Sequence, residues 1–572
     1  MDTLPGGCRE HCRARTTVRM GYGEVCPTGA LRRSMNGTII QAQEAFRSQA
    51  WRDGVSEALT TLYGEERVPI LLDRFEDLVA RNRCERPDHL LQRDATLPCD
   101  WYRDSKNAVY VLYADRFSPE APRGHKLTAL RDSLPYFQEL GVNILHVLPI
   151  LASTGDDGFA VRDYRQIDEA LGNNDACIDL IQSAHDRGLW IALDFVLNHV
   201  ADEHAWATLA KAGDPAHLDD FIWDVSGTGR PWDGVRDVFT EFAPGQWDYV
   251  PELHRYVWAT FYKRRPVDRE GRWDPQGPRH PFAQWDLNYA NPHVLFAMVE
   301  NLLFLANWGV DAFRLDAVPH IWKQQGTDCR GRPEAHLLVR LFRAALEVVA
   351  PRAVLLAEAN QRYEQVIAHF DRGRGVHIAY HFSLMPALWQ AAIDGTDEAI
   401  ERELARMPTT EQQNHPWWWI FSECHDEVGL STVDRPTLQR LWNYFQAEGG
   451  GLPFKVEPGG HLPRAVSGTT YSLLHGDIDK IVRLWELKLQ LAANPKCKGT
   501  PLFYMGEELG VENLALDAST RHDTRFAKRV PLTRDLKARR LHPGAKENRL
   551  FERLRALLAA RAESENGEDQ PE

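Results

Sequence analysis

Short apolar runs that end in a carboxylate constrain the fold of this chain more than any other feature. Three of them end in FRLD, LLAE and CHD, at Asp316, Glu358 and Asp426. Apolar runs of this length are typical of parallel strands that are buried on both faces. The carboxyl ends of such strands meet at one rim of a (β/α)8 barrel, where catalytic groups lie in enzymes of that fold. A pair of carboxylates on one rim is the minimum needed to break a glycosidic bond.

Apolar runs alternate with helical patterns along most of the chain. Eight predicted strands cover residues 108–117, 142–150, 189–196, 310–318, 353–359, 376–384, 417–424 and 500–505. Predicted helices cover residues 127–140, 175–187, 292–308, 333–349, 478–492 and 550–562. Strands separated by helices at this spacing indicate a parallel sheet. We therefore predict an α/β protein in which residues 101–562 form a (β/α)8 TIM barrel.

Two segments interrupt this alternation and are predicted to be insertions into the barrel. Residues 200–285 follow the third strand, are rich in Trp, Pro, Gly, Asp and Arg, and show little periodicity. A segment of this length is expected to form a subdomain rather than a linker. Residues 429–470 follow the seventh strand and are the second predicted insertion.

The two ends of the chain differ from the barrel segment. Residues 41–100 carry leucines at helical spacing and are predicted to form a small helical N-terminal domain. Residues 1–40 show no periodicity, and residues 563–572 are acidic and polar. Both of these terminal segments are predicted to be disordered, because neither has enough apolar residues to bury a core.

Composition excludes several classes of partner. The formal net charge is -14, and no long basic stripe reverses it, so we expect no nucleic-acid partner. No stretch reaches the roughly 18 apolar residues of a membrane span, and the N-terminus lacks the apolar core of a signal peptide. The nine cysteines are odd in number and have no framework spacing, which favours reduced thiols in a cytoplasmic protein.

No cofactor and no metal are predicted. Cys8, His11 and Cys12 are close enough in sequence to bind a metal, but no second ligand pair completes a structural zinc site. The acidic pair Asp156 and Asp157 supplies too few oxygen ligands for calcium.

The environment of each strand-end carboxylate suggests a different role. Arg314 lies two residues before Asp316, on the same face of the strand, and is expected to lower the pKa of that carboxylate and keep it ionised as a nucleophile. Glu358 ends a wholly apolar run, so burial is expected to raise its pKa toward that of a working acid. The alternatives are a structural ion pair for Asp316 and a backbone contact for Glu358.

Weaker signals lie at the ends of the seventh and third strands. Asp426 beside His425 could bind two adjacent sugar hydroxyls, or it could cap a helix. Asp194 and the pair Asn198 and His199 end the third strand, and they could instead shape the loop that follows. Each of these signals is weak alone. Four of them together, in this order at the ends of strands 3, 4, 5 and 7, are a much stronger indication of an active site.

These segments resemble the four signature segments of the α-amylase superfamily of glycoside hydrolases. They read DFVLNH from Asp194, FRLD from Phe313, LLAEAN around Glu358, and HD at residues 425–426. Within the superfamily the chain is most similar to amylosucrase and sucrose hydrolase over residues 45–558. Supporting segments are WDLNYANP, LFLANWGVDAFRLDAV, IWKQQGTDC, GLPF, VSGT and FYMGEELG.

The resemblance implies roles for the signature residues. Asp316 would be the nucleophile that forms a β-glucosyl-enzyme, and Glu358 the acid that protonates the leaving oxygen and then acts as base. Asp426 would stabilise the transition state. The substrate-binding residues would be Asp194, His199, Arg314 and His425. Retention through a covalent intermediate requires the two working carboxylates to be about 5–5.5 Å apart.

Two further positions bear on the substrate. In the sucrose-acting subgroup an aspartate and an arginine close the pocket behind the glucosyl ring, and the matching residues are Asp156 and Arg525. The ring-stacking aromatic, usually tyrosine in this motif, is Phe159. Hydrogen-bond reach between Asp156 and Arg525 would favour sucrose, whereas the same two residues apart would favour starch.

The leading hypothesis is therefore a retaining α-glucosyl transferase or hydrolase that acts on sucrose or another α-glucoside, with a glucan or water as acceptor. The alternatives are an α-amylase or α-glucosidase acting on malto-oligosaccharides, or a catalytically impaired sugar-binding relative. The β-sandwich that normally follows the eighth barrel helix is predicted to be missing, and its loss is expected to expose apolar surface.

Overall fold

The computed structural model describes residues 48–239, 245–264, 280–407, 416–456, 460, 462–517, 520 and 523–568. The predicted disordered lead at residues 1–40 lies outside these residues, as does the end of the predicted tail from residue 569 onward. Helix α20 (Lys546–Glu568) occupies the first part of the tail segment. That part of the segment is therefore helical, in contrast to the predicted disorder.

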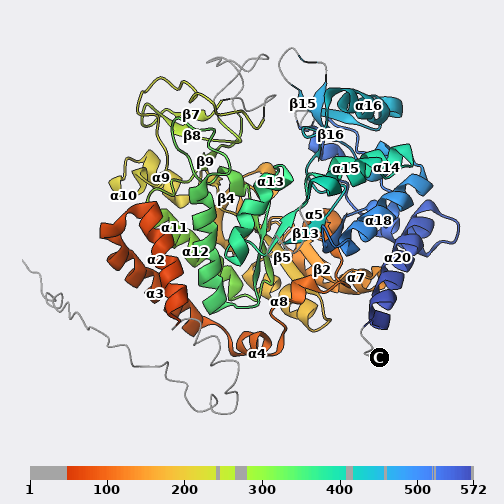
Figure 1. The fold of residues 1–572 in the computed structure, drawn as a ribbon, viewed down its shortest axis with the longest axis horizontal. Coiled ribbons are helices and arrows are strands. Elements are labelled where there is room, and N and C mark those ends of the chain that lie inside the picture. Colours follow the sequence, from red (N-terminus) through yellow and green to blue (C-terminus); the bar gives the residue numbers. More distant parts are fainter. Residues whose placement is uncertain are drawn as a thin grey trace, which may run out of the picture.

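Eight parallel strands close into a barrel, which confirms the predicted (β/α)8 architecture (Figure 1). Around the barrel the order is β1-β17-β13-β12-β11-β10-β5-β2. The strands are β1 (Val109–Leu112), β2 (Ile144–Val147), β5 (Trp190–Val196), β10 (Ala312–Asp316), β11 (Val354–Ala357), β12 (Ile378–Tyr380), β13 (Trp417–Ile420) and β17 (Gly499–Tyr504). Most are shorter than the predicted apolar runs, because the ends of those runs leave the sheet and pack in the loops.

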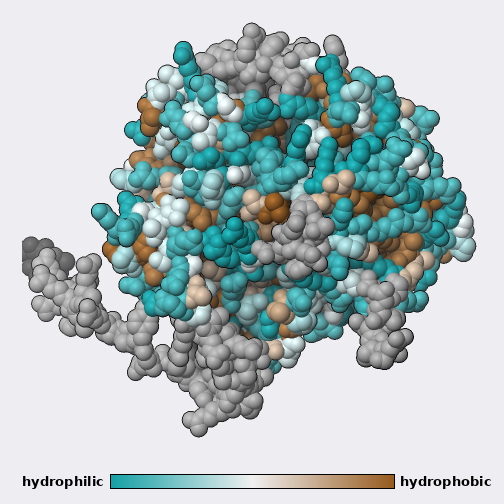
Figure 2. Space-filling view, viewed as in Figure 1, coloured by the Kyte–Doolittle hydropathy of each residue, from teal (hydrophilic) through white to brown (hydrophobic). Residues whose placement is uncertain are grey.

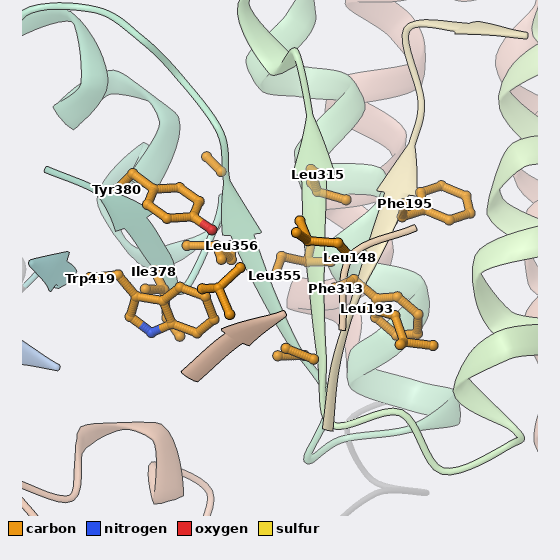
Figure 3. Close-up of a cluster of buried hydrophobic side chains, with 14 of the residues drawn as sticks. Leu148, Leu193, Phe195, Phe313, Leu315, Leu355, Leu356, Ile378, Tyr380 and Trp419 are labelled. Carbon is orange, nitrogen blue, oxygen red and sulfur yellow. The ribbon is translucent and has the colours of Figure 1, made fainter. Parts of the chain in front are cut away.

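Alternation along the strands separates the core from the site. On β5 and β10, Phe195 and Phe313 point outward and meet edge to face at 6.3 Å, and Phe195 also contacts Phe342 of helix α12 (Pro333–Val349) (Figure 3). Side chains on a strand point alternately to opposite faces. The intervening residues Asp194 and Arg314, paired across the two strands, therefore face the barrel axis.

Helices surround the barrel and are mostly where the sequence predicts them. They include α6 (Lys126–Asp132), α7 (Leu134–Leu140), α8 (Asn174–His185), α11 (Pro292–Ala306), α12, α14 (Leu384–Asp394), α18 (Ile478–Ala493) and α20. The single helix predicted over residues 127–140 is two helices, which meet at Ser133. Pro135 lies in the first turn of α7, where its missing N–H costs nothing.

Three N-terminal helices form an additional layer on one side of the barrel (Figure 1, red). They are α2 (Gln49–Tyr63), α3 (Val68–Glu85) and α4 (Asp88–Thr96). Trp51 Nε1 donates a 3.0 Å hydrogen bond to the carbonyl of Ala344 on α12. Buried side chains such as Leu59 and Phe75 belong to the same core cluster as the barrel. These helices thus share the barrel core instead of enclosing one of their own.

Both insertions contain secondary structure that the sequence did not reveal. The first holds β6 (His199–Ala201), α9 (Ala205–Lys211), α10 (Pro215–Leu218), the hairpin β7 (Trp247–Val250) and β8 (Arg255–Trp258), and β9 (Gln284–Asp286). The second holds β14 (Val428–Gly429), α16 (Arg435–Gln446), β15 (Leu452–Val456) and β16 (Pro463–Ser467). Figure 1 shows both on the upper side of the barrel, to its left and right.

The face of the molecule shown in Figure 2 is mainly hydrophilic, with apolar residues in several separate areas. The large apolar side chains that are exposed are Ile70, Leu209, Val225, Leu514 and Leu541. They come from different segments of the chain. No described helix combines the length and apolar character needed to cross a membrane.

Candidate active site

The three signature carboxylates meet at the carboxyl ends of the barrel strands. Asp316 is the last residue of β10, the fourth strand of the barrel in chain order. Glu358 follows β11, the fifth, and its backbone N–H donates a 3.0 Å hydrogen bond to the Leu315 carbonyl. Asp426 lies in the loop after β13, the seventh strand.

All three carboxylates line one cavity of about 810 Å³, which we call the active-site cavity. Eight of the ten predicted site residues line it: Asp156, Phe159, His199, Asp316, Glu358, His425, Asp426 and Arg525. The other two, Asp194 and Arg314, are buried and are not among its lining residues.

Arg314 connects Asp194 to Asp316, the candidate nucleophile. Its Nη1 donates to Asp194 Oδ1 at 2.6 Å and to Asp316 Oδ1 at 2.8 Å. The other oxygen of Asp194 lies 2.9 Å from His146 Nε2. Asp194 therefore fixes the guanidinium of Arg314, which in turn fixes the carboxylate of Asp316.

Asp316 and Glu358 do not titrate as the sequence predicts. Burial raises the pKa of Asp316 to about 8; Arg314 opposes the rise, and Glu358, Asp194 and Asp426 add to it. Arg314 does lower this pKa, as predicted, but burial and three neighbouring carboxylates outweigh it, so the net shift is upward. Burial also raises the pKa of Glu358, in the predicted direction.

Two buried carboxyl groups that repel each other hold one proton between them over a range of pH. Asp316 has a direct ion pair to Arg314. Glu358 has no such contact and instead accepts a 2.9 Å hydrogen bond from the backbone N–H of Ala317. The contact with Arg314 favours ionised Asp316, so the shared proton is favoured on Glu358. Ala317 has a φ of +53°, a strained conformation for a non-glycine residue next to the nucleophile candidate.

Asp426 is held ionised. Burial opposes its charge, but His425, Arg525 and Arg529 outweigh burial and hold its pKa well below the ordinary value. Arg525 Nη1 donates a 3.0 Å hydrogen bond to Asp426 Oδ1, and Arg529 Nη2 lies 3.8 Å from the same oxygen. Burial lowers the pKa of His425 to about 3. His425 is therefore uncharged at neutral pH, and Arg525 and Arg529 supply the positive charge next to Asp426.

Asp156 and Arg525 lie close to each other in the lining of the cavity. Asp156 Oδ1 lies 3.7 Å from Arg525 Nη2, an ion-pair distance that is longer than a hydrogen bond. The hydrogen-bond condition that would favour sucrose is therefore not met. Arg525 makes a closer contact to Asp523, at 2.7 Å, and Asp156 accepts a 3.0 Å hydrogen bond from Gln284 Nε2. Burial raises the pKa of Asp156 to about 7, against the lowering effect of Arg525.

Aromatic side chains of the cavity pack against one another and against Arg314. The rings of Phe159 and His425 stack at 5.2 Å and 11°, and the Arg314 guanidinium lies 5.4 Å from the Phe159 ring. His199 Nε2 lies 3.2 Å from the Phe159 carbonyl, and Asn198 Nδ2 lies 3.2 Å from His199 Nδ1. Burial lowers the pKa of His199 to about 4, so it is a neutral hydrogen-bonding group at pH 7.

Several cavity residues were not predicted as site residues. Lys323 Nζ contacts Asp286 Oδ2 at 2.5 Å and Asn198 Oδ1 at 2.6 Å, and it belongs to the IWKQQG segment. His320, Arg330, Arg362 and Lys455 also line the cavity. The unusual IWKQQGTDC sequence could have signalled Lys323, whereas no pattern in the sequence singled out the arginines.

One cluster of potential metal ligands occurs among the described residues, and it belongs to this site. Cys424, His425 and Asp426 place one ligand atom each within 4.8 Å of one another. Burial raises the pKa of the Cys424 thiol to about 12, so it is protonated at neutral pH, whereas metals bind the thiolate. The chemistry of this donor set does not favour a metal. The candidate ligands Cys8, His11 and Cys12 lie outside the described residues.

Comparison with known proteins identifies the family. The Alpha-amylase family (alpha amylase, catalytic domain) matches residues 111–270 and 278–435, more than half of the chain. This chain belongs to the α-amylase family. The signature segments thus led to the right superfamily, while the closer resemblance to amylosucrase stays a prediction.

Curated relatives of this family member include several α-glucoside enzymes. Trehalose synthase of Thermus thermophilus is 32% identical over 418 residues, covering 72% of this chain and 39% of that protein. Trehalose synthase/amylase TreS of Mycolicibacterium smegmatis is 30% identical, and the match spans 65% of its length. Glucosylglycerate phosphorylase of Spirochaeta thermophila is 28% identical over 532 residues, covering 90% of this chain and 82% of that protein. The chain therefore spans less than two thirds of the two trehalose synthases.

Solved structures of low sequence identity share the fold of this family member. Sucrose 6F-phosphate phosphorylase from Thermoanaerobacter thermosaccharolyticum aligns with a TM-score of 0.62 at 20% identity, over 80% of this chain and 87% of that chain. Trehalose-6-phosphate hydrolase of Bacillus licheniformis aligns with a TM-score of 0.56 at 19% identity, over 81% and 84%.

Proposed function

We propose that this chain is a retaining α-glucosyl-transferring enzyme that opens small α-glucosides by double displacement at Asp316. One observation carries the proposal: Arg314 bridges Asp194 and Asp316 at 2.6 and 2.8 Å, directly below a cavity that Glu358 and Asp426 also line. An ionised carboxylate and a protonated one on adjacent strand ends are the groups that retaining glycosidases use.

In the first step, Asp316 attacks the anomeric carbon of the bound glucosyl group. Glu358 gives its proton to the leaving oxygen, which its raised pKa equips it to do at neutral pH. Positive charge develops on the sugar ring, and ionised Asp426 stabilises it. The product of this step is a β-glucosyl ester of Asp316.

In the second step, Glu358 acts as the base. It removes a proton from the acceptor hydroxyl, which attacks the anomeric carbon and releases Asp316 with overall retention. Water as acceptor gives hydrolysis, and a glucan hydroxyl gives transfer. Phe159 would stack against the glucosyl ring, while His199 and His425 would bind its hydroxyls as neutral groups.

We propose that one end of the cavity is closed behind the glucosyl ring, which would favour action on a terminal glucosyl group. Asp156 and Arg525 form an ion pair there, and Arg525 is also bonded to Asp426. A chain that continued past the glucosyl ring would have to break this ion pair. We therefore propose exo-acting chemistry on small α-glucosides, in preference to internal attack on starch.

Sucrose is one proposed substrate, since the segments quoted above resemble those of sucrose-acting members. Trehalose and glucosylglycerate are the others, from the names of relatives that are 32% and 28% identical to this chain. These glucosides share the α-glucosyl group and differ in the leaving group. The proposed roles of Asp316, Glu358 and Asp426 are the same for all of them.

The test is incubation of the purified protein with sucrose, trehalose, glucosylglycerate and maltoheptaose, with quantification of glucose, the leaving group and longer products. Asp316→Asn is the matched inactive control. Release from one of the small glucosides, with the α-anomer formed first, supports the proposal. Release from maltoheptaose alone would assign the chain to the amylase alternative, and inactivity on every α-glucoside would leave only a sugar-binding role.

A further inference from the structure

Exposed arginines at the cavity mouth have no part in the chemistry described so far. Arg236, Arg330 and Arg362 line the cavity and are exposed, whereas Asp316 and Asp156 in the same lining are largely buried. The three arginines come from the first insertion, the loop between β10 and α12, and the loop after β11. Within the part of the chain that the structure describes, none of them forms an ion pair with a carboxylate.

Three other cations of the cavity are paired with carboxylates. Lys323 is paired with Asp286 at 2.5 Å, Lys455 with Glu427, and Arg525 with Asp523 at 2.7 Å. The basic lining residues are Arg236, Lys323, Arg330, Arg362, Lys455, Arg464 and Arg525; the acidic ones are Asp156, Asp237, Asp316, Asp328, Glu358, Asp426 and Glu427. The two charges are equal in number, and the exposed carboxylates Asp237 and Asp328 lie next in sequence to Arg236 and two residues before Arg330 without forming an ion pair with either arginine.

The loop that carries Arg330 is firmly anchored. Cys329 is 3% exposed and packs with Trp247 and Trp258 of the first insertion. Gly331 has a φ of +61°, and its N–H donates a 2.7 Å hydrogen bond to the Pro319 carbonyl. A side chain at Gly331 would meet Gln361 at 2.8 Å, so this loop lies against the loop after β11. Arg330 and Arg362 therefore project from two loops in contact.

Arg330 lies on the side of the cavity where the leaving group must sit. Its guanidinium donates to the carbonyl of Asn360, two residues after the proposed acid Glu358. A general acid must lie beside the leaving oxygen, because it transfers a proton to that atom. The leaving group, and later the acceptor, is thus placed within reach of Arg330.

Several positively charged side chains act on one another around Arg330. Although Arg330 reaches solvent, partial burial and Arg236 lower its pKa, against the opposing effects of Glu358 and Asp328. After burial, Arg330, Lys323 and Lys455 are the next largest causes that lower the pKa of His320 in the same cavity, so His320 is neutral. A bound anion would relieve the electrostatic repulsion between Arg236 and Arg330.

We propose that Arg330, Arg362 and Arg236 form a subsite for a carboxylate or phosphate group on the leaving-group side of the cavity. Guanidinium groups bind both anions with paired hydrogen bonds. The inference rests on the proposed glucosyl transfer and extends it to the class of leaving group or acceptor. Either the anion belongs to the aglycone, or inorganic phosphate replaces water as the acceptor.

The phosphate route balances without a further reactant. A phosphate oxygen forms a bond to the anomeric carbon as the bond from that carbon to Asp316 breaks. The electron pair returns to the Asp316 carboxylate, and Glu358 takes a proton if the attacking oxygen carries one. The product is α-glucose 1-phosphate.

The experiment uses the full chain with α-glucosyl fluoride, a neutral donor whose leaving group needs no proton from Glu358. Glycerate and glycerol are the matched charged and neutral acceptors, and inorganic phosphate is the third. Calorimetric titration of glycerate, glycerol and phosphate into the protein measures binding without turnover. Arg330→Gln is compared with Arg67→Gln, an exposed arginine of the N-terminal helices.

We expect transfer to glycerate to exceed transfer to glycerol by about tenfold or more, since hydrogen bonds between charged groups are worth that factor. Arg330→Gln should reduce this ratio by about tenfold, and Arg67→Gln should leave it unchanged. Formation of glucose 1-phosphate would identify phosphate as the acceptor, and a preference for glycerate alone would place the anion on the aglycone.

The outcomes separate the two proposals. Turnover of the fluoride with equal use of glycerol and glycerate, and no binding of phosphate, overturns the anionic subsite and leaves the proposed function standing. Arg330-dependent binding of glycerate or phosphate without turnover supports the subsite and overturns the proposed function. Failure of both turnover and binding overturns both.

Discussion

Arg314 and Asp194 form a fully buried ion pair of 2.6 Å directly beneath the candidate nucleophile. Asp194 is a positioning residue in this arrangement, because its carboxylate contacts Arg314 and His146 and does not line the cavity. The position of the Asp316 carboxylate therefore depends on Asp194, a residue of the neighbouring strand.

Asp194→Asn keeps the shape of the side chain and removes its charge. Arg314 would then pair with Asp316 alone and draw it away from the anomeric carbon. Because small misplacements of a reacting group cost about 100-fold in rate, we expect kcat to fall by about that factor with little change in KM. Steady-state kinetics on the best α-glucoside measures this, with the exposed Asp179→Asn as control. An unchanged kcat would show that Asp194 does not position the nucleophile.

Asp316→Asn should stabilise the protein, in a pH-dependent way. Burial raises the pKa of both Asp316 and Glu358, that of Asp316 from 3.8 to about 8, so in the folded state this pair retains a proton that the unfolded chain loses between these values. The wild type should therefore lose stability as the pH rises from 4 to 8, at about 1.4 kcal/mol per pH unit for one group. Denaturant unfolding should show Asp316→Asn more stable by roughly 3 kcal/mol or more at pH 8 and nearly equal at pH 4.5. Equal stability at both pH values would contradict this assignment.

The barrel could be predicted because its signal is local. Helix α12 has the predicted bounds, residues 333–349, since Pro333 starts it and apolar residues recur at helical spacing. Asp316 and Glu358 could be placed at strand ends for the same reason. Strand β12 is only three residues long, although nine were predicted, because the rest of that apolar run is buried outside the sheet.

The charge state and the mouth of the cavity could not be predicted, because they depend on contacts between distant segments. Arg314 is the nearest charge to Asp316 in sequence, but burial and Glu358 decide the direction of its pKa shift. Arg330 reaches the cavity because Cys329 packs against Trp247 and Trp258, whose insertion carries no periodic pattern. A single sequence contains no trace of that packing.

Asp156 should make sugar binding depend on pH. Burial raises its pKa to about 7, so it is neutral below pH 7 and ionised above it. Ionised Asp156 pairs more strongly with Arg525 and accepts hydrogen bonds from sugar hydroxyls more strongly. We expect the affinity for the glucoside to rise by about tenfold between pH 6 and 8. Calorimetry in the Asp316→Asn background avoids turnover, and Asp156→Asn in that background should abolish the rise. A rise that persists without the Asp156 carboxylate would assign it to another group.

The buried pair Lys488 and Glu507 supports the eighth strand of the barrel. The two side chains are 2.9 Å apart and fully buried, and Glu507 also accepts a 3.0 Å hydrogen bond from Trp485 Nε1. Lys488→Met removes the cation and leaves a buried carboxylate, which should cost roughly 3–5 kcal/mol of unfolding free energy. Adding Glu507→Gln removes the uncompensated charge and should restore part of that loss. Chemical denaturation of both variants tests this, and a double variant no more stable than Lys488→Met would show that packing, not charge, decides stability here.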